Sequence, residues 1–193
     1  MMRLLAASLI FFLSAYAASA AQTLDLIAER ATIRIGYITD EAPFSAKGQD
    51  GTPKGYAIDL CGKVADAVVQ KLPGIKREYV ETTLGNGFDA VKNGDIDLLC
   101  GAITMSLGRR ETVDFTQPIF LTGATALLRK DSPDYLQILF LDKTPVRSVK
   151  AQPSTTSVIG VRANTTTGAT LREALGPDVP KTRVVDFDTH EDG

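Results

Sequence analysis

The sequence has little of what catalysis, metal binding or nucleic-acid binding usually requires. Its 193 residues include one histidine and two cysteines, and they form no Ser/His/Asp set, metal-ligand cluster or glycine-rich phosphate loop. The 21 lysines and arginines are interspersed with 23 aspartates and glutamates, so no basic stripe is available for nucleic acid. We therefore expect a soluble protein whose specificity lies in a local site without metal or cofactor.

The N-terminus predicts export. Met1, Met2 and Arg3 form a short positive head, an apolar run extends over Leu4–Leu13, and Ala18-Ser19-Ala20 supplies a small-residue cleavage site. The apolar run is shorter than the roughly 20 residues that a membrane-spanning helix needs. We expect residues 1–20 to be a signal peptide cleaved near Ala20, with an uncleaved membrane anchor as the alternative.

Two cysteines, Cys61 and Cys100, remain after that cleavage. An exported protein meets an oxidising compartment in which thiols pair. A disulfide and two buried free thiols both stay open, because separation along the chain does not fix the distance between the two Cα atoms.

The first part of the mature chain alternates strand and helix patterns. Strands are expected at Thr32–Tyr37, Arg77–Val80 and Ile96–Cys100, helices at Leu60–Leu72 with Asp59 as the cap and at Phe88–Asn93, and a hairpin-like connection at Lys47–Gly55. The order β, α, β, α, β predicts an α/β layer with a mostly parallel sheet, whose ligands bind beyond the carboxyl ends of the strands.

Further elements are expected along the rest of the chain. A helical turn is expected at Leu107–Glu111, strands at Val113–Thr116, Ala124–Leu128, Val158–Val161 and Thr182–Phe187, and a helix at Ala169–Leu175. The composition shifts in 130–157 to that of a linker or inserted loop, so we expect lobe 1 over 21–129 and a partial lobe 2 over 158–193. Because no helix follows the last strand, we expect a fragment of something longer, with a small single domain as the alternative.

Several short motifs occur in a characteristic order. They are Ala42-Pro43-Phe44, Gly55-Tyr56-Ala57-Ile58-Asp59-Leu60, Asn93-Gly94-Asp95-Ile96-Asp97, Thr104–Arg110 and Val113–Pro118. Together they resemble the family 3 bacterial extracellular solute-binding proteins over about Thr32–His190, with most likeness to the glutamate/aspartate-binding branch. The resemblance implies a two-lobed α/β periplasmic binding protein of type II, a monomer that delivers a polar amino acid to the permease of an ABC importer.

The resemblance gives Arg109 the main role in the ligand site. A guanidinium can meet the planar carboxylate of an amino acid with two parallel charge-assisted hydrogen bonds. By the same resemblance, Thr104 adds backbone or hydroxyl contacts and Ala102 offers a carbonyl to the α-ammonium. Arg110 is the rival of Arg109, and the spacing from Thr104 favours Arg109.

In the second lobe, Thr165 matches a hydroxyl residue that closes on the carboxylate. Arg162 lies beside it on a loop that leads into a helix, whose N-terminal amides favour an anion. His190 matches a ligand-side residue of the acidic-amino-acid branch. An ordinary turn for the Thr165 loop and a surface position for His190 are the alternatives.

The remaining ligand-side candidates are Ile38, Glu41 and Leu84. Ile38 stands where the acidic-ligand branch has a basic residue, and Glu41 where the basic-ligand branch has a stacking aromatic, so neither specificity carries over. A binding protein is the expected function, and no catalysis is expected. The alternatives are a periplasmic dehydratase on the same scaffold, with Glu41 or Glu173 as proton donor, and the ligand-sensing domain of a receptor or channel.

Overall fold

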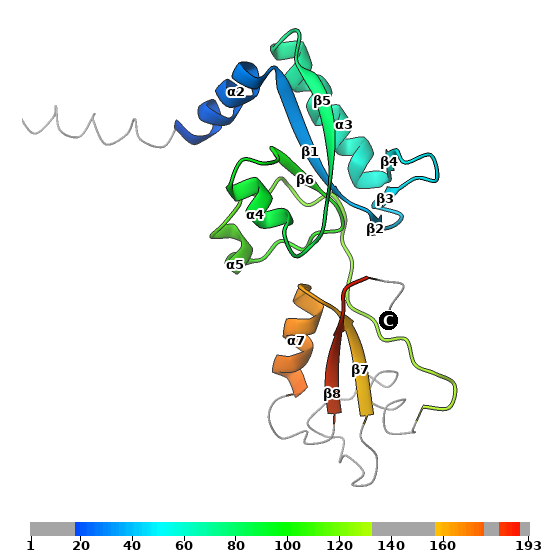
Figure 1. Cartoon of the computed structure of the whole chain (residues 1–193). Helices are drawn as coiled ribbons and strands as arrows, with labels where there is room; N and C mark the ends of the chain where they lie inside the picture. The colour runs from blue at the N-terminus through cyan, green and yellow to red at the C-terminus, as the bar shows by residue number, and fades with distance from the viewer. Residues whose placement is uncertain (1–17, 133–156, 176–181, 190–193) are drawn as a thin grey trace, which may run out of the picture. The chain divides into compact units, whose positions relative to one another are not determined.

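The computed structural model describes residues 18–132, 157–175 and 182–189. Contacts within the chain divide it into two compact units, Met1–Ile103 and Thr104–Gly193 (Figure 1). The predicted division into two lobes with a linker over 130–157 stays a prediction, since most of that segment lies outside the described residues. Within the described parts, no helix is both long and apolar enough to cross a membrane.

The first unit is built on a parallel sheet with the strand order β5-β1-β6. Strand β1 spans Thr32–Ile38, β5 spans Lys76–Thr82 and β6 spans Leu98–Cys100. Tyr37 is in register with both Glu81 and Cys100. All three strands were predicted, and their parallel pairing confirms the α/β layer.

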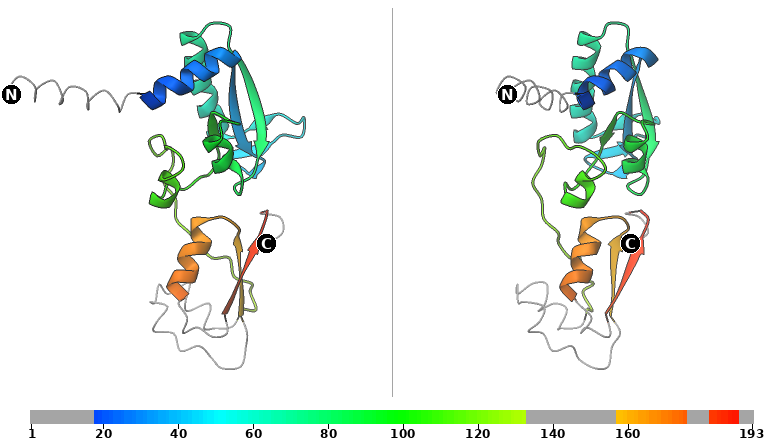
Figure 2. Two further views of the ribbon diagram at one scale, coloured as in Figure 1. Left: turned by 60° about the vertical axis from the view of Figure 1, so that its left-hand side comes forward. Right: turned by 90° about the vertical axis from the view of Figure 1, so that its left-hand side faces the viewer.

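Helices α2 (Ala18–Arg30), α3 (Tyr56–Lys71) and α4 (Gly87–Lys92) accompany this sheet (Figure 2). Ile27 of α2 and Ile58 and Ala65 of α3 share one buried cluster with alternate residues of β1. Since alternate strand residues point to the same face, α2 and α3 pack on one face of the sheet.

Helix α2, which the sequence analysis did not predict, contributes Ile27 to the core. The Arg30 guanidinium donates to the Asp97 carboxylate at 2.6 Å, and Arg34 N–H donates to the same carboxylate at 2.8 Å. The Asp97 side chain is only 6% exposed, so this ion pair fixes the end of α2 to the turn before β6. The helix begins at Ala18, within the predicted cleavage site, and residues 1–17 lie outside the described part.

The prediction that Asp59 caps the second helix is wrong. Helix α3 begins four residues earlier than predicted, at Tyr56, and its N-cap is Gly55 with φ 130°, a backbone conformation that favours glycine. A Cβ at Gly55 would also clash with the Phe44 carbonyl oxygen. The amide groups of Tyr56 and Ala57 donate to the backbone carbonyls of Pro43 and Phe44, so backbone carbonyls accept the hydrogen bonds that a capping side chain was expected to accept.

A small antiparallel sheet lies in the same unit. It has the order β2-β3-β4, with β2 at Asp40–Glu41, β3 at Ser45–Lys47 and β4 at Pro53–Lys54. The turn between β3 and β4 confirms the predicted hairpin-like connection. Strand β2 was not predicted, because two residues are too few to show an alternation.

The second unit contains α5 (Leu107–Arg110), β7 (Ser157–Arg162), α7 (Thr166–Leu175) and β8 (Thr182–Phe187). Strands β7 and β8 pair in parallel over their full lengths, and α7 packs against this pair (Figure 2). The predicted strands at 113–116 and 124–128 are wrong: both segments are irregular. Leu127 there is fully exposed, and an apolar alternation without a neighbouring strand has no ladder to join.

Candidate functional site

Four of the predicted ligand-side residues lie at the carboxyl edge of the first sheet. Ile38 is the last residue of β1, Leu84 follows the end of β5, and Ala102 follows the end of β6. Glu41 lies on β2, three residues after Ile38. In a parallel sheet the carboxyl ends of the strands share one edge, which is the edge where α/β proteins bind ligands.

Glu41 is the most confined of these residues. It is 5% exposed, and its Oε2 accepts a hydrogen bond from the Ala102 N–H at 2.7 Å. The position of a Cβ on Gly101 would be 2.6 Å from the same oxygen and 3.1 Å from Cδ1 of Ile38. A residue without a side chain at 101 is therefore what lets the carboxylate reach the end of β6.

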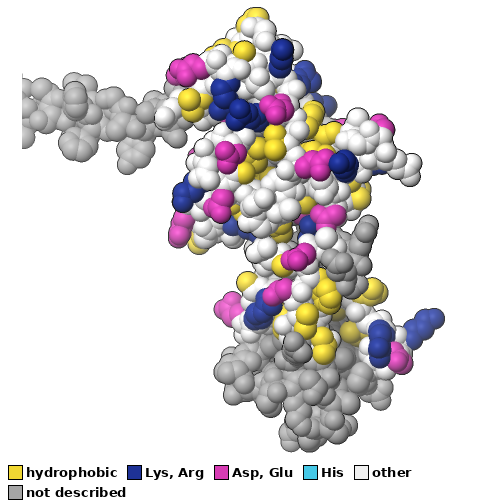
Figure 3. All heavy atoms as spheres, viewed as in Figure 1, with side chains coloured by type: hydrophobic (Ala, Val, Ile, Leu, Met, Phe, Trp, Pro, Cys, Tyr) yellow, Lys and Arg dark blue, Asp and Glu magenta, His cyan; other side chains and the backbone are white. Residues whose placement is uncertain are grey.

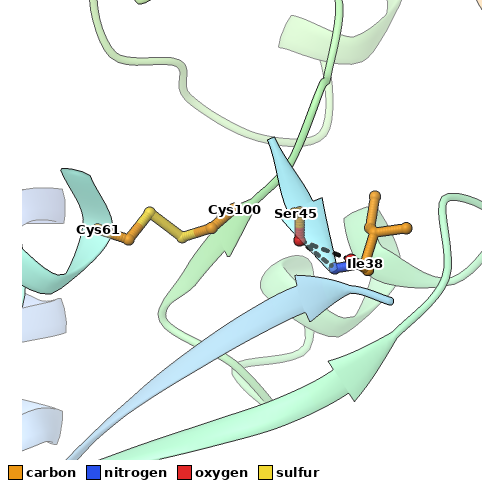
Figure 4. The surroundings of a disulfide bond; sticks show 4 residues. All are labelled: Ile38, Ser45, Cys61 and Cys100. Atoms are coloured by element: carbon orange, nitrogen blue, oxygen red, sulfur yellow. Dashed lines mark hydrogen bonds between the residues drawn. A yellow bond between two sulfur atoms is a disulfide. The ribbon is translucent and has the colours of Figure 1, made fainter. Parts of the chain in front are cut away.

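The backbone of Ile38 is hydrogen-bonded by the side chain of Ser45. Oγ of Ser45 accepts a hydrogen bond from Ile38 N–H at 3.1 Å and donates to the Ile38 carbonyl at 2.6 Å (Figure 4). Ser45 is fully buried and Ile38 is 1% exposed. This double hydrogen bond fixes the backbone from which the chain turns into β2.

The end of β6 is fixed by a disulfide. Cys61 of α3 and Cys100 of β6 are bonded, with their Cα atoms 6.5 Å apart (Figure 4). Of the two possibilities that the sequence left open, the structure has the bonded one. The bond ties α3 to the strand that leads into Gly101 and Ala102.

A polar network lies beside this edge. The Tyr37 hydroxyl donates to Oε1 of Glu81 at 3.2 Å, and Nζ of Lys47 lies 2.6 Å from the same oxygen. The hydrogen bond from Lys47 lowers the pKa of the Glu81 carboxyl and raises that of Lys47, while burial raises the pKa of Tyr37. The network joins β1, β3 and β5, and it accounts for these charges without a ligand.

Figure 3 shows acidic and basic side chains interspersed over the drawn face of the first unit. Among the described residues, no group of three His, Cys, Asp or Glu side chains could hold a metal ion.

Arg109 lies on α5 in the second unit. Ser106 caps this short helix by accepting from Arg109 N–H. Nη1 of Arg109 donates to the Thr104 carbonyl at 2.7 Å, and Nη2 donates to the Asn164 carbonyl at 2.8 Å. The guanidinium of Arg110 instead lies 3.1 Å from the Met105 sulfur.

The loop that Arg109 reaches is the one predicted for the second lobe. Oγ1 of Thr165 donates to the Arg162 carbonyl at 2.7 Å and accepts from Gly168 N–H at 3.3 Å. The latter bond satisfies an amide in the first turn of α7, as an N-cap does. The structure therefore brings four predicted site residues together around one loop: Thr104, Arg109, Arg162 and Thr165.

Asn164 was missed as a member of this group. The sequence indicated only a polar turn there, and Asn164 has φ 60°, which asparagine tolerates better than most residues. Its contribution is a carbonyl, which every residue has, so no side-chain signal could have revealed it. His190 lies outside the described residues, and Glu173 is exposed on α7.

The family model for bacterial extracellular solute-binding proteins, family 3, matches residues 33–183. This chain belongs to that family, as the sequence predicted. The chain is 38% identical over 111 residues to the L-glutamate/L-aspartate-binding protein of Pseudomonas aeruginosa, covering 56% of this chain and 37% of that protein. It is 31% identical over 125 residues to the glutamate/aspartate import solute-binding protein of Salmonella typhimurium, covering 61% of this chain and 41% of that protein.

Among solved structures, the ancestral amino acid-binding protein AncCDT-1, a precursor of cyclohexadienyl dehydratase, is 30% identical to this chain. The TM-score is 0.67, and the match covers 88% of this chain and 66% of that structure. The predicted fold class, that of the two-lobed α/β periplasmic binding proteins, is confirmed. The chain spans about two fifths of the length of the two curated relatives.

Proposed function

We propose that this protein binds a polar amino acid and delivers it to the permease of an ABC importer. The observation that carries the proposal is the contact between Arg109 and the Asn164 carbonyl, two residues before the first residue of α7. A guanidinium and the N-terminus of a ten-residue helix both favour an anion. Their convergence on one loop suits the carboxylate that all amino acids share.

Ligand binding would replace the contact between Arg109 and the Asn164 carbonyl. The two Nη atoms of Arg109 are held by neutral backbone carbonyls. A carboxylate forms charge-assisted hydrogen bonds about twice as strong as neutral ones and can accept from both arms of the guanidinium at once. An amino-acid carboxylate is therefore expected to displace the Asn164 carbonyl, with Thr165 and the first amides of α7 completing its surroundings.

The test is a titration of the purified protein with the common amino acids, followed by calorimetry and by thermal unfolding. A ligand that binds only the folded state raises the unfolding temperature. Arg109→Ala should weaken binding by about 30-fold or more, since loss of one partner of a desolvated charge pair costs about 2–5 kcal/mol. Arg110→Ala, which removes the same charge from the next position, is the control and should leave the affinity within about threefold. Unchanged affinity in Arg109→Ala would refute the assignment.

A second candidate function is a dehydratase, which the buried carboxylate of Glu41 favours. AncCDT-1, to which the chain is similar, is itself an amino acid-binding protein, but one that is a precursor of cyclohexadienyl dehydratase. Such an enzyme needs a carboxylic acid as proton donor within reach of its substrate. Glu41 is confined enough for that role, whereas Glu173 is exposed. Turnover of prephenate by the purified protein, lost in Glu41→Gln, would establish the enzyme and displace the binding protein.

We also infer that the protein is exported to the periplasm after cleavage near Ala20, and that it acts as a monomer. The positive head, apolar run and small-residue site of the N-terminus support the export, as does membership of a family of extracellular proteins. Mass determination of the exported protein tests this point. The expected N-terminus is Ala21 or Gln22, and a protein that keeps Met1 would contradict cleavage.

A further inference from the structure

We infer that Asn93 is a site of spontaneous deamidation in the folded protein, whereas Asn86, seven residues earlier, is protected by the fold. Each of these asparagines is followed by a glycine, Gly94 and Gly87 respectively. The inference concerns the first unit alone, and it does not depend on which ligand the protein binds.

The modification needs no reactant except water. The backbone nitrogen of the glycine loses its proton to the solvent and attacks Cγ of the preceding asparagine. A succinimide ring forms, and the side-chain nitrogen leaves as ammonia after taking up a proton from the solvent. Water then opens the ring at either carbonyl carbon and leaves aspartate or isoaspartate. Glycine favours the attack, because it has no Cβ near the nitrogen and its backbone adopts many conformations.

Hydrogen bonds hold both reacting groups of the first Asn-Gly pair. Oδ1 of Asn86 accepts from the Thr83 N–H at 2.9 Å, from the Thr83 hydroxyl at 2.9 Å and from the Thr82 hydroxyl at 2.6 Å. The nitrogen of Gly87 donates to the Thr83 carbonyl at 2.9 Å, and Gly87 is buried. Deamidation of Asn86 therefore requires these bonds to break and a buried glycine to meet water.

The second Asn-Gly pair lies at the C-terminal end of α4, in the turn that leads to β6 (Figure 1). Asn93 is the C-cap of this six-residue helix and is exposed. The nitrogen of Gly94 donates to the Val91 carbonyl at 3.0 Å. A Cβ at Gly94 would meet nothing within 4 Å, so the backbone has room to move there.

The two pairs differ in what it costs to reach the reactive geometry. Asn86 has ψ −10° and Asn93 has ψ −8°, and both must leave this helical region before the next nitrogen can reach Cγ. The end of a helix frays at little cost, whereas buried segments open only with a larger part of the structure. Gly87 belongs to the second kind, since a Cβ there would lie 2.8 Å from the Leu99 side chain of β6. Asn93 therefore reacts through local opening, and Asn86 through unfolding of the unit.

Isoaspartate at position 93 would lengthen the main chain by one carbon atom in a closely fixed turn. The N–H groups of Asp95 and Ile96 both donate to the Ala90 carbonyl, and Ile96 is 1% exposed. The product also has a negative charge at the C-terminal end of a helix, where the helix dipole disfavours it. The isoaspartyl form should therefore unfold at a lower temperature.

The test uses the whole protein, incubated in mildly alkaline buffer with and without a denaturing concentration of urea. After reduction, trypsin places the two asparagines in separate peptides, 78–92 and 93–109. Mass spectrometry measures the conversion of amide to acid in each, corrected with a sample digested at time zero. Incubation lasts until half of Asn93 has reacted in urea. Without urea, Asn93 should react at least about tenfold faster than Asn86, and in urea the two rates should agree within about threefold.

Asn93→Gln is the matched control, because glutamine keeps the amide and would have to form a larger, less favourable ring. Position 93 of this variant should show no conversion over the same period. A second comparison isolates the extra main-chain atom. The deamidated fraction, separated by anion exchange, should unfold at a lower temperature than Asn93→Asp, which has the same charge on an ordinary main chain.

Three results would overturn the inference. Equal rates for Asn93 and Asn86 without urea would show that the hydrogen bonds of Asn86 give no protection. Conversion of Asn93 only in urea would show that the end of α4 does not open far enough for the reaction. Equal unfolding temperatures of the deamidated fraction and Asn93→Asp would contradict the expected damage to the turn. None of these results bears on amino-acid binding.

Discussion

Glu41 and Gly101 are sixty residues apart in the sequence and so close in the structure that a single added methyl group would separate them. A Cβ on Gly101 would lie 2.6 Å from Oε2 of Glu41. This oxygen accepts a hydrogen bond from the N–H of Ala102, the residue after Gly101. The Glu41 carboxylate can therefore occupy this position only because residue 101 has no side chain.

Gly101→Ala should therefore damage both stability and ligand affinity. Forcing an extra methyl group into a packed position costs typically about 1–3 kcal/mol, and the displaced carboxylate would lose its hydrogen bond with Ala102. Urea unfolding and calorimetric titration measure the two effects. Gly108→Ala is the control, since a Cβ at that position meets nothing within 4 Å and should leave stability within about 1 kcal/mol.

If the clash is the cause, Gly101→Ala should cost less stability in a Glu41→Ala background. The difference between the two costs is the coupling energy of the pair. Equal costs in both backgrounds would show that the alanine harms the backbone of residue 101 and not the position of the carboxylate.

The disulfide between Cys61 and Cys100 predicts a dependence of stability on redox conditions. The bond closes a loop over a sequence separation of 39 residues, for which the chain-entropy relation gives roughly 4 kcal/mol. Reduction should lower the free energy of unfolding by an amount of this order, measured by urea unfolding with and without dithiothreitol. The double variant Cys61→Ala/Cys100→Ala should unfold identically in both conditions, and a sensitivity to reductant in that variant would rule out the disulfide as the cause.

The sequence predicted local elements well where an alternation spans a whole strand. Strand β8 has the predicted bounds, and β1 extends one residue past its predicted end. Both were predictable because burial of one face of a strand places apolar residues at every second position of the sequence. The strands predicted at 113–116 and 124–128 failed for the complementary reason. Their alternation is present, but a strand also needs a neighbour with which to share hydrogen bonds.

Contacts between distant segments lay beyond the sequence. The residue types of the candidate site could be chosen by resemblance, and the structure places Arg109 and Thr165 around one loop. That the Asn164 carbonyl would hold Arg109, 55 residues away, and that Ala102 would hold Glu41, 61 residues away, could not be predicted. Backbone donors and acceptors occur at nearly every residue, so their pairing depends on the fold and not on residue type.

The hydroxyl of Ser45 should be worth more than that of an ordinary serine. Oγ both accepts from the Ile38 N–H and donates to the Ile38 carbonyl, and the site is fully buried. In Ser45→Ala, both backbone groups of Ile38 lose this partner where no water replaces it. An unsatisfied buried polar group costs about 1–3 kcal/mol, so the free energy of unfolding should fall by at least that amount in urea titrations.

The control is Thr116→Ala, which removes a hydroxyl that is hydrogen-bonded to an exposed carbonyl. It should change the free energy of unfolding by no more than about 0.5 kcal/mol. Because Ile38 leads directly into β2, Ser45→Ala should also weaken amino-acid binding. An unaltered affinity would show that the hydrogen bonds of Ser45 stabilise the end of β1 without contributing to the ligand site.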